Sequence, residues 1–186
     1  SSGKDVNTAL AAGSIDFGLE GSCPASLAIA QDLGVELIWI HEVLGDVESL
    51  VAKGTSGINT VADLKGKKVA VPFASTAHFS LLKAMENAGL SASDVTVLDM
   101  QPDKIYASWN SGDIDAAYIW EPTLSQLSNK KTVIISGELA KAGYMTSNVE
   151  VVRTKFAEAH PDIVAAYVKA PVSYTHLRAH ETLSDL

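Results

Sequence analysis

The sequence predicts an α/β fold, built on a mostly parallel sheet with helices on its faces. Two observations lead to this prediction. Short apolar segments that favour strands alternate with Ala-rich segments that favour helices, and the connections between them are short. Several strand segments, such as 116–120, are continuous apolar runs, which is typical of strands buried on both faces of a sheet.

Strands are expected wherever a short apolar run is bounded by glycine, proline or polar residues. The strand at 67–71 ends at Pro72, and the strand at 49–52 is closed by Gly54 and Gly57. The complete set of expected strands covers 15–18, 35–40, 49–52, 67–71, 95–98, 116–120, 132–135 and 149–152.

Helices are expected to begin at capping residues and to end at glycines. Ser22 is expected to cap the second helix, because Pro24 follows just inside it. Ser75 or Thr76 is expected to cap the helix that runs to Asn87. The expected helices cover 5–12, 22–34, a short turn from 60, 75–87, 102–109, 121–127, 156–160 and 161–169.

Composition excludes several classes of protein. The chain has 186 residues, with 14 Lys+Arg against 22 Asp+Glu, and its net charge of −8 argues against a nucleic-acid binder. Hydrophobic residues make up 47% and charged residues 19%, as in a globular protein of one domain or two small lobes. No apolar run approaches the roughly 18 residues of a membrane span. The single cysteine, Cys23, excludes an internal disulfide framework and a multi-cysteine metal site.

Polar residues gather at four turns where an expected strand meets an expected helix, at 20–24, 72–78, 100–102 and 120–122. Ligands bind at such turns in open α/β sheets. The first two turns place hydroxyls and unpaired backbone N–H groups at a helix start, which suits an anion. The alternative is that Ser22, Ser75 and Thr76 only cap their own helices, and the sequence leaves both interpretations open.

Two charged or titratable residues at these turns also have two interpretations. His78, in the first turn of its helix, either completes an anion pocket as a donor or is a surface or capping residue. Glu121 either holds a cationic group against Trp120 or is a favourable charge at a helix N-terminus.

Known catalytic motifs are missing from the sequence. It contains no P-loop, no G-x-G-x-x-G and no G-x-S-x-G, and the second histidine of H-E-x-x-H is missing after His41-Glu42. Cys23 and His78 would form a nucleophile–base pair only if the fold brought them together. We therefore predict no catalytic residue, no metal site and no cofactor.

Longer stretches resemble the solute-binding proteins of sulfonate and taurine ABC importers, from Ser2 to Ala170. The S-T-A-H turn at 75–78 and the L-D-M-Q-P segment at 98–102 resemble the taurine-binding branch in particular. The other matching stretches are 11–18, 21–24, 64–72, 107–120, 151–153 and 156–161.

This resemblance implies a type II solute-binding fold of two α/β lobes that clamp a ligand between them. The implied first lobe covers 1–53 and 144–170, and the second covers 54–143. The crossovers would lie near 49–57 and 143–149. Residues 171–186 instead resemble translated sequencing-adaptor read-through, so this tail is excluded from the functional interpretation.

The resemblance also implies a sulfonate site with groups from both lobes. The taurine-binding branch has Asp where this chain has Asn148. Either Glu121 or Glu20 then takes the charge role toward an ammonium, or the ligand is an uncharged alkanesulfonate. The full set of expected ligand-binding residues is Gly21, Ser22, Cys23, Ser75, Thr76, His78, Gln101, Trp120, Glu121 and Asn148.

The implied function is capture of taurine or a related alkanesulfonate for an ABC importer. The implied partner is the membrane permease, and the protein would act without catalysis, as a monomer, in the periplasm or lipid-anchored outside the cell. Three alternatives stay open: a binding protein for a thiamine-pyrimidine or nitrate-like ligand, an enzyme of the same fold (a pyrimidine synthase or a Cys23–His78 hydrolase), and a transcription-factor effector domain.

The family chain begins with a strand before Ser1 and continues with helices after Ala170. A missing strand leaves an unpaired edge in a sheet. We therefore expect this chain to melt at a lower temperature than a longer form with both ends restored. Equal midpoints in thermal melts of the two forms would contradict this expectation.

Overall fold

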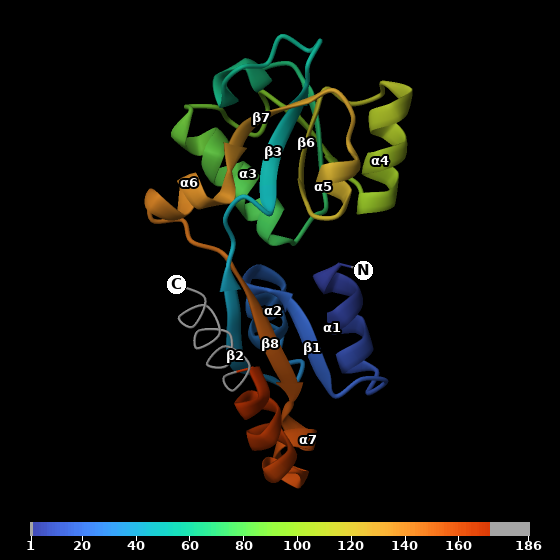
Figure 1. Cartoon of the computed structure of the whole chain (residues 1–186), viewed down its shortest axis with the longest axis vertical. Helices are drawn as coiled ribbons and strands as arrows, with labels where there is room; N and C mark the ends of the chain where they lie inside the picture. The colour runs from blue at the N-terminus through green and yellow to red at the C-terminus, as the bar shows by residue number, and fades with distance from the viewer. Residues whose placement is uncertain (1, 172–186) are drawn as a thin grey trace, which may run out of the picture.

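The computed structural model describes residues 2–171, which form two lobes around two separate sheets (Figure 1). We call the part around the three-stranded sheet lobe one and the part around the five-stranded sheet lobe two. The α/β, two-lobed fold class expected from the sequence is therefore confirmed. The tail from 172 to 186 lies outside the described residues.

Lobe one is built on an antiparallel sheet. Its strands are β1 (Phe17–Gly21), β8 (Ser147–Arg153) and β2 (Val35–Val43), in the order β1-β8-β2. Helices α1 (Gly3–Ala11) and α2 (Ser22–Ala30) cover one face, and α7 (Thr154–Ala159) follows β8, with a further helix over 161–171. Leu10 of α1, Ala25 and Ala28 of α2 and Val151 of β8 form the buried core of this lobe.

Lobe two is built on a mixed sheet. Its strands are β5 (Thr96–Asp99), β4 (Lys68–Val71), β6 (Ala116–Trp120), β3 (Glu48–Lys53) and β7 (Lys130–Ile135), in that order. Its helices are α3 (Thr76–Asn87), α4 (Pro102–Ser111), α5 (Thr123–Gln126), α6 (Ser136–Lys141) and a 3₁₀ turn (Val61–Leu64).

The core of lobe two fills both faces of this sheet. Leu50 and Tyr118 pack on one face against Leu81 of α3, and Val51 and Ile119 pack on the other against Ile105 of α4. Strands buried on both faces explain why the sequence shows continuous apolar runs here.

The expectation of a mostly parallel sheet is wrong. Among the described strands, two of the six pairings are parallel, β4 with β5 and β4 with β6. The reason is that β3 and β8 are the strands that follow each crossing between the lobes. Strand β8 lies between β1 and β2 and is antiparallel to both, and β3 lies between β6 and β7 and is antiparallel to both. The alternation of strands and helices along a sequence does not show whether neighbouring strands are parallel or antiparallel.

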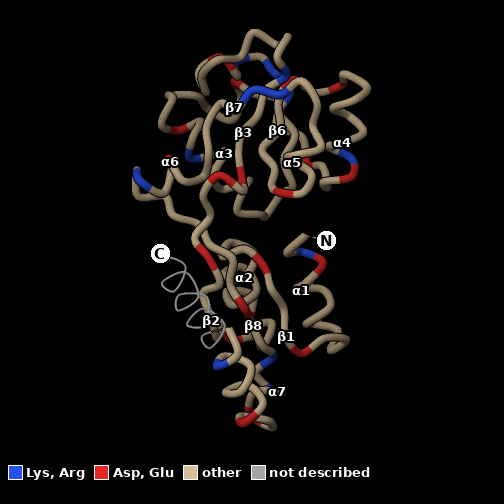
Figure 2. Tube along the Cα trace, viewed as in Figure 1, with Lys and Arg blue, Asp and Glu red and all other residues tan. Residues whose placement is uncertain are grey.

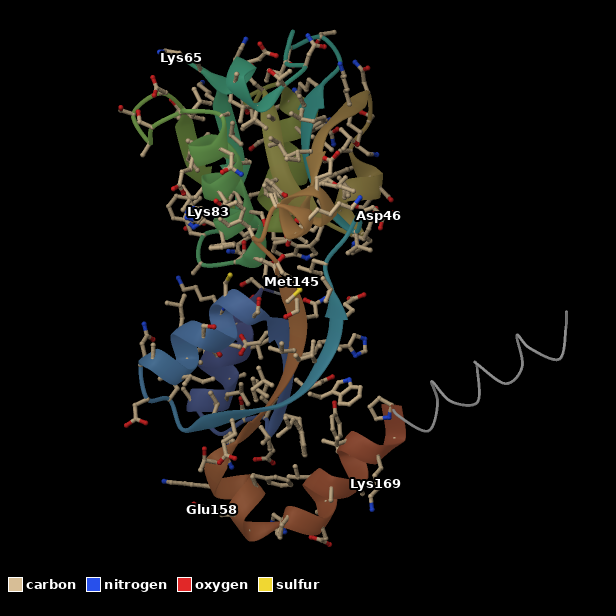
Figure 3. The ribbon with its side chains drawn as sticks, turned by 90° about the vertical axis from the view of Figure 1, so that its left-hand side faces the viewer. Asp46, Lys65, Lys83, Met145, Glu158 and Lys169 are labelled. Carbon is tan, nitrogen blue, oxygen red and sulfur yellow. The ribbon has the colours of Figure 1, made fainter. Side chains whose placement is uncertain are left out.

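The first crossing also lies earlier in the chain than 49–57. β2 ends at Val43 and β3 begins at Glu48, so the chain changes lobe over 44–47, and β3 belongs to lobe two rather than lobe one. The Gly/Ser/Thr-rich stretch from Gly54 instead turns at the far end of lobe two (Figure 1). The return crossing runs between α6 and β8, beside Met145 (Figure 3).

Several helix boundaries differ from the expectation. Ser22 does not cap α2; Gly21 occupies the N-cap position, and Ser22 is the first helical residue. The cap at Ser75 is confirmed, because its Oγ accepts a hydrogen bond from the His78 N–H at 3.1 Å. Helix α6 was not expected from the sequence, since Gly137 lies in its first turn. No helix in the described part of the chain is long and apolar enough to cross a membrane.

Candidate functional site

A cavity of about 340 Å³ lies between the two lobes. Its wall combines residues from the N-terminal ends of α1, α2 and α3, from β1, β2, β3, β6 and β8, and from the first crossing. The lining residues are Ser2, Gly3, Val6, Leu19, Glu20, Gly21, Pro24, Glu42, Leu44, Val47, Glu48, Ser75, Thr76, Trp120, Glu121 and Asn148.

Three helices begin at this cavity. Ser2 and Gly3 start α1, Gly21 precedes α2, and Ser75 and Thr76 start α3. The N–H groups of a first helical turn have no acceptor within the helix, and the helix dipole adds partial positive charge at that end. Three such ends from two lobes make an anion site out of backbone groups.

The two lobes touch directly at this site. A Cβ atom built on Gly21 of lobe one would lie 2.7 Å from Cγ2 of Thr76 in lobe two. A real Cβ does not approach a carbon this closely, so only glycine at position 21 allows the lobes to meet as they do. The crossings are also tied together, since the Leu44 N–H donates to the Thr146 carbonyl at 2.9 Å.

Glu48 is a buried acidic residue of the cavity wall that no pattern in the sequence indicated. Its side chain is buried, yet it lines the cavity at the start of β3. Thr76 Oγ1 donates to Oε2 at 2.6 Å, and Ser136 Oγ donates to Oε1 at 2.8 Å. Burial raises the pKa of Glu48, while these two hydrogen bonds act in the opposite direction.

Glu20 is a second buried carboxyl in the cavity wall, with an exposed fraction of 4%. Neither of its oxygens has a hydrogen-bond partner among the described residues. Burial raises the pKa of Glu20 to about 7. Burial of an unpaired polar group is costly, so this arrangement points to a partner that the protein itself does not supply.

The other cavity carboxylates already have partners. Glu42 Oε1 accepts a hydrogen bond from Asn148 Nδ2 at 2.8 Å. Glu121 is exposed and accepts from both the N–H and the hydroxyl of Ser125, at 3.0 and 2.7 Å. No Lys, Arg or His of residues 2–171 is among the lining residues, so acidic groups from both lobes dominate the described side-chain charge there (Figure 2).

The sequence profile of the NMT1/THI5-like family matches residues 1–176. The chain belongs to this family.

Relatives of this NMT1/THI5-like chain include proteins named for taurine or sulfonate binding, which confirms the resemblance seen in its sequence. It is 40% identical over 172 residues to the taurine-binding periplasmic protein of Escherichia coli K12, covering 92% of this chain and 53% of that protein. It is 34% identical over 162 residues to a putative aliphatic sulfonates-binding protein of Bacillus subtilis 168, covering 86% of this chain and 48% of that protein. The chain therefore spans about half the length of these curated relatives.

Solved structures agree with this family assignment. The alkanesulfonate-binding protein SsuA of Xanthomonas axonopodis pv. citri, bound to MOPS, superposes with a TM-score of 0.83 at 26% identity, over 98% of this chain and 63% of that protein. The aliphatic sulphonate-binding SsuA of Escherichia coli gives 0.77 at 25% identity, over 98% and 64%. The desulfurization enzyme DSZB shares the fold alone, with 0.66 at 18% identity, over 91% and 64%.

The structure brings six of the ten expected binding residues of this NMT1/THI5-like chain into the cavity wall. They are Gly21, Ser75, Thr76, Trp120, Glu121 and Asn148. The hydroxyls of two of them are already engaged, since Ser75 Oγ donates to the Pro72 carbonyl at 2.6 Å and Thr76 Oγ1 donates to Glu48. A contact between these two residues and an anion would therefore use the backbone N–H groups at the start of α3.

The other four expected residues lie outside the cavity wall. Ser22 Oγ accepts from the Ser147 N–H at 3.2 Å, which ties α2 to β8. His78 stacks on Phe73, with ring centroids 4.3 Å apart, and burial lowers its pKa. Gln101 is the N-cap of α4. Sequence spacing cannot show these side-chain directions, because neighbouring residues of one turn point to different sides.

Cys23 has no activating partner among the described residues. Burial, followed by the charge of Glu48, raises the pKa of its thiol, which is opposite to what a nucleophilic cysteine needs. His78 is engaged elsewhere, since its Nδ1 accepts from the Ala74 N–H at 3.4 Å. In the described part of the chain, no group of three His, Cys, Asp or Glu residues is placed to hold a metal ion.

We expect Cys23→Ala to change sulfonate affinity by no more than about threefold, the usual range for a side chain without a special role. The thiol is outside the cavity wall, and its raised pKa disfavours the thiolate. Isothermal titration calorimetry with ethanesulfonate checks this. Loss of a turnover that the wild-type chain shows would instead support a thiol enzyme.

We expect Gly21→Ala to weaken ligand binding by between about fivefold and about a hundredfold, corresponding to an overpacking cost of about 1–3 kcal/mol. The added methyl group would meet Thr76 and hold the lobes apart. The matched control is Gly45→Ala at the first crossing, where a Cβ meets no atom within 4 Å. Equal affinities of Gly21→Ala and wild type, measured by calorimetry, would show that this contact does not control closure.

Proposed function

We propose that this chain captures an aminoalkanesulfonate such as taurine between its lobes, as part of an extracytoplasmic solute-binding protein of an ABC importer. One observation carries the proposal. A single cavity combines three converging helix N-termini with buried carboxyls, and none of the described residues in its wall has a cationic side chain. This pattern is complementary to a small molecule with an anionic head and an ammonium tail.

The helix N-termini suit the sulfonate group. A sulfonate has three oxygens that accept hydrogen bonds, and it keeps its negative charge at any physiological pH. Apart from the N–H groups of Ser2, Asp5 and His78, which have protein acceptors, the first-turn N–H groups of α1, α2 and α3 are donors held in fixed positions, so little reorganisation is needed on binding. Closure of the lobes excludes water and strengthens these hydrogen bonds.

Glu48 suits the ammonium group. It lies beside Thr76, at the border between the anion site and the rest of the cavity. Burial raises its pKa, and no described Lys, Arg or His lines the cavity beside it. An ammonium would supply that charge and lower the pKa again. Glu48 thus takes the role that the sequence assigned to Glu121 or Glu20, while the carboxylate of Glu121 is held by Ser125.

The cavity fits the competing ligand classes less well. Trp120 is the one aromatic residue in the described part of the wall, and Phe73 stacks on His78, so the described residues offer no pair of rings to clamp a pyrimidine. A nitrate-like anion has no group that would use the buried carboxyls. An enzymatic function is disfavoured by the state of Cys23 described above.

The whole protein's partners and location are part of this proposal. The relatives with the names of taurine- and sulfonate-binding proteins support a small-molecule ligand and a membrane permease as partners. The periplasmic relative supports a location outside the cytoplasm. We further propose that the protein works as a monomer, with a lipid anchor as the alternative to a free periplasmic form.

We expect Glu48→Gln to weaken taurine binding by about tenfold to a hundredfold, because a hydrogen bond to a charged group contributes about 1.5–3 kcal/mol. Ethanesulfonate, which has no ammonium, should lose much less affinity. The matched control is Glu121→Gln, whose carboxylate is exposed and held by Ser125, and which should have a smaller effect. Calorimetric titrations of the three proteins with both ligands provide the comparison.

A thermal-shift titration tests the ligand class itself. A ligand at about 100 times its Kd adds about 2.7 kcal/mol to the free energy of unfolding. Taurine, ethanesulfonate, sulfate and a thiamine pyrimidine are the four probes. Stabilisation by the pyrimidine alone, or by none of the sulfonates, would overturn the proposed function.

A further inference from the structure

Glu20 is the group in the cavity wall whose chemistry the proposed function leaves unused. Its side chain is nine-tenths or more buried, it lines the cavity, and both of its carboxyl oxygens are without a partner among the described residues. Buried carboxyls in proteins almost always have a hydrogen-bond partner. The ligand is therefore the natural partner of this one.

The fold places Glu20 at the anion end of the cavity. Glu20 pairs with Val149 across the β1–β8 ladder, so both point to the sheet face that α1 and α2 cover. A Cβ built on Gly3, the first residue of α1, would lie 3.3 Å from Glu20 Oε2 and would also meet the Pro24 ring. The carboxyl thus lies where α1 and α2 both begin.

Glu48, by contrast, is held in lobe two by Thr76 and Ser136. The two buried carboxyls therefore face the ligand from different lobes. An ionised Glu20 would repel a sulfonate bound at the starts of α1 and α2. A protonated Glu20 has one O–H donor, and a sulfonate oxygen is an acceptor that carries no proton of its own.

We propose that Glu20 contacts the ligand's sulfonate as a protonated carboxyl, so that capture takes up a proton and the affinity for sulfonates falls as pH rises. This inference rests on the proposed function, because it takes the sulfonate to lie at the helix N-termini. It makes Glu20 the residue that links ligand capture to the acidity of the surroundings.

The charged groups around Glu20 do not supply the missing partner. Glu150 of β8 lies on the other face of the sheet, because its neighbours Val149 and Val151 face α1 and α2. Arg153, on the same strand, pairs with Asp16 at 2.8 Å. The remaining titratable groups on the elements that face Glu20 are Lys4 and Asp5 on α1, Cys23 on α2, Glu42 on β2, Glu48 on β3 and Glu121 after β6.

The sign of the pH dependence follows from burial. Burial alone raises the pKa of Glu20 to about 7, so the carboxyl is neutral below pH 7 and ionises above it. A sulfonate oxygen that accepts a hydrogen bond from the carboxyl O–H stabilises the neutral form of Glu20 further. Binding is then strongest in acid and is lost as pH rises through the pKa of the free protein.

The test is the pH dependence of binding in wild type, Glu20→Gln and Glu158→Gln. Glu158 is an exposed carboxyl at the far end of lobe one (Figure 3) and serves as the control. Ethanesulfonate is the first probe, because without an ammonium it does not engage the ionised form of Glu48. Kd is measured by calorimetry at pH 6 and pH 8, and taurine is the second probe.

For wild type and Glu158→Gln we expect ethanesulfonate binding to be about tenfold weaker at pH 8 than at pH 6, as one proton with a pKa near 7 requires. For Glu20→Gln we expect the same Kd at both pH values, because the amide donates a hydrogen bond regardless of pH. Titrations in two buffers of different ionisation enthalpy should show uptake of about one proton by wild type at pH 8.

Three results would overturn the inference while leaving the proposed function intact. The first is pH-independent binding by wild type, and the second is an equal pH slope in Glu20→Gln. The third is a loss of taurine but not ethanesulfonate affinity in Glu20→Gln, which would place the ammonium at Glu20. If Glu20→Gln does not fold, the proton count of wild type decides alone, and a count near zero rejects the inference. Failure of wild type to bind any sulfonate at pH 6 would reject the proposed function and this inference together.

Discussion

The structure depends on two crossings of the chain that run side by side between the lobes. The Leu44 N–H donates to the Thr146 carbonyl, so the outgoing and returning segments are joined by backbone. Each crossing leads directly into a strand, β3 at Glu48 and β8 at Ser147. The crossings therefore fix which residues reach the cavity: Glu48 opens β3, which lies between β6 and β7, and Asn148, one residue into β8, pairs with Gly21 across the ladder.

Electrostatics decides what this cavity can hold. Helix N-termini favour negative charge, while buried carboxyls without cations favour positive charge, and both are present in one wall. Among the described residues both oxygens of Glu20 lack a partner, Glu48 has hydroxyl partners but no cation in the cavity wall, and burial raises the pKa of both carboxyls. A ligand with both charges relieves both costs at once, whereas a simple anion or cation relieves one.

The sequence predicted the local features well, because caps and strand patterns depend on near neighbours. Ser75 caps its helix as expected, and the Asp63 carboxylate accepts from the Thr60 N–H at 2.8 Å as a capping box requires. Long-range features were predicted less well. The direction of β3, the place of the first crossing and the orientation of His78 all depend on contacts between segments far apart in the chain.

The same limit explains which site residues were found. Gly21 and Thr76 belong to strand-to-helix turns, which sequence patterns locate. Glu48 stands at the start of an ordinary apolar strand, and its hydrogen bonds come from residues 28 and 88 positions away. Sequence patterns placed Glu20 in the strand-to-helix turn at 20–24. They could not show that it is buried without a partner, because that depends on how α1 and α2 pack around it.

Thr76 links the two kinds of group in the cavity wall. Its backbone N–H belongs to the first turn of α3, which begins at the cavity, while its hydroxyl donates to Glu48 at 2.6 Å. If the ligand is bound as proposed, Thr76 borders both the anion site and Glu48, which favours a ligand whose anionic and cationic groups lie within a few bonds of each other. A short spacer between the two charges, as in taurine, satisfies both ends of the site.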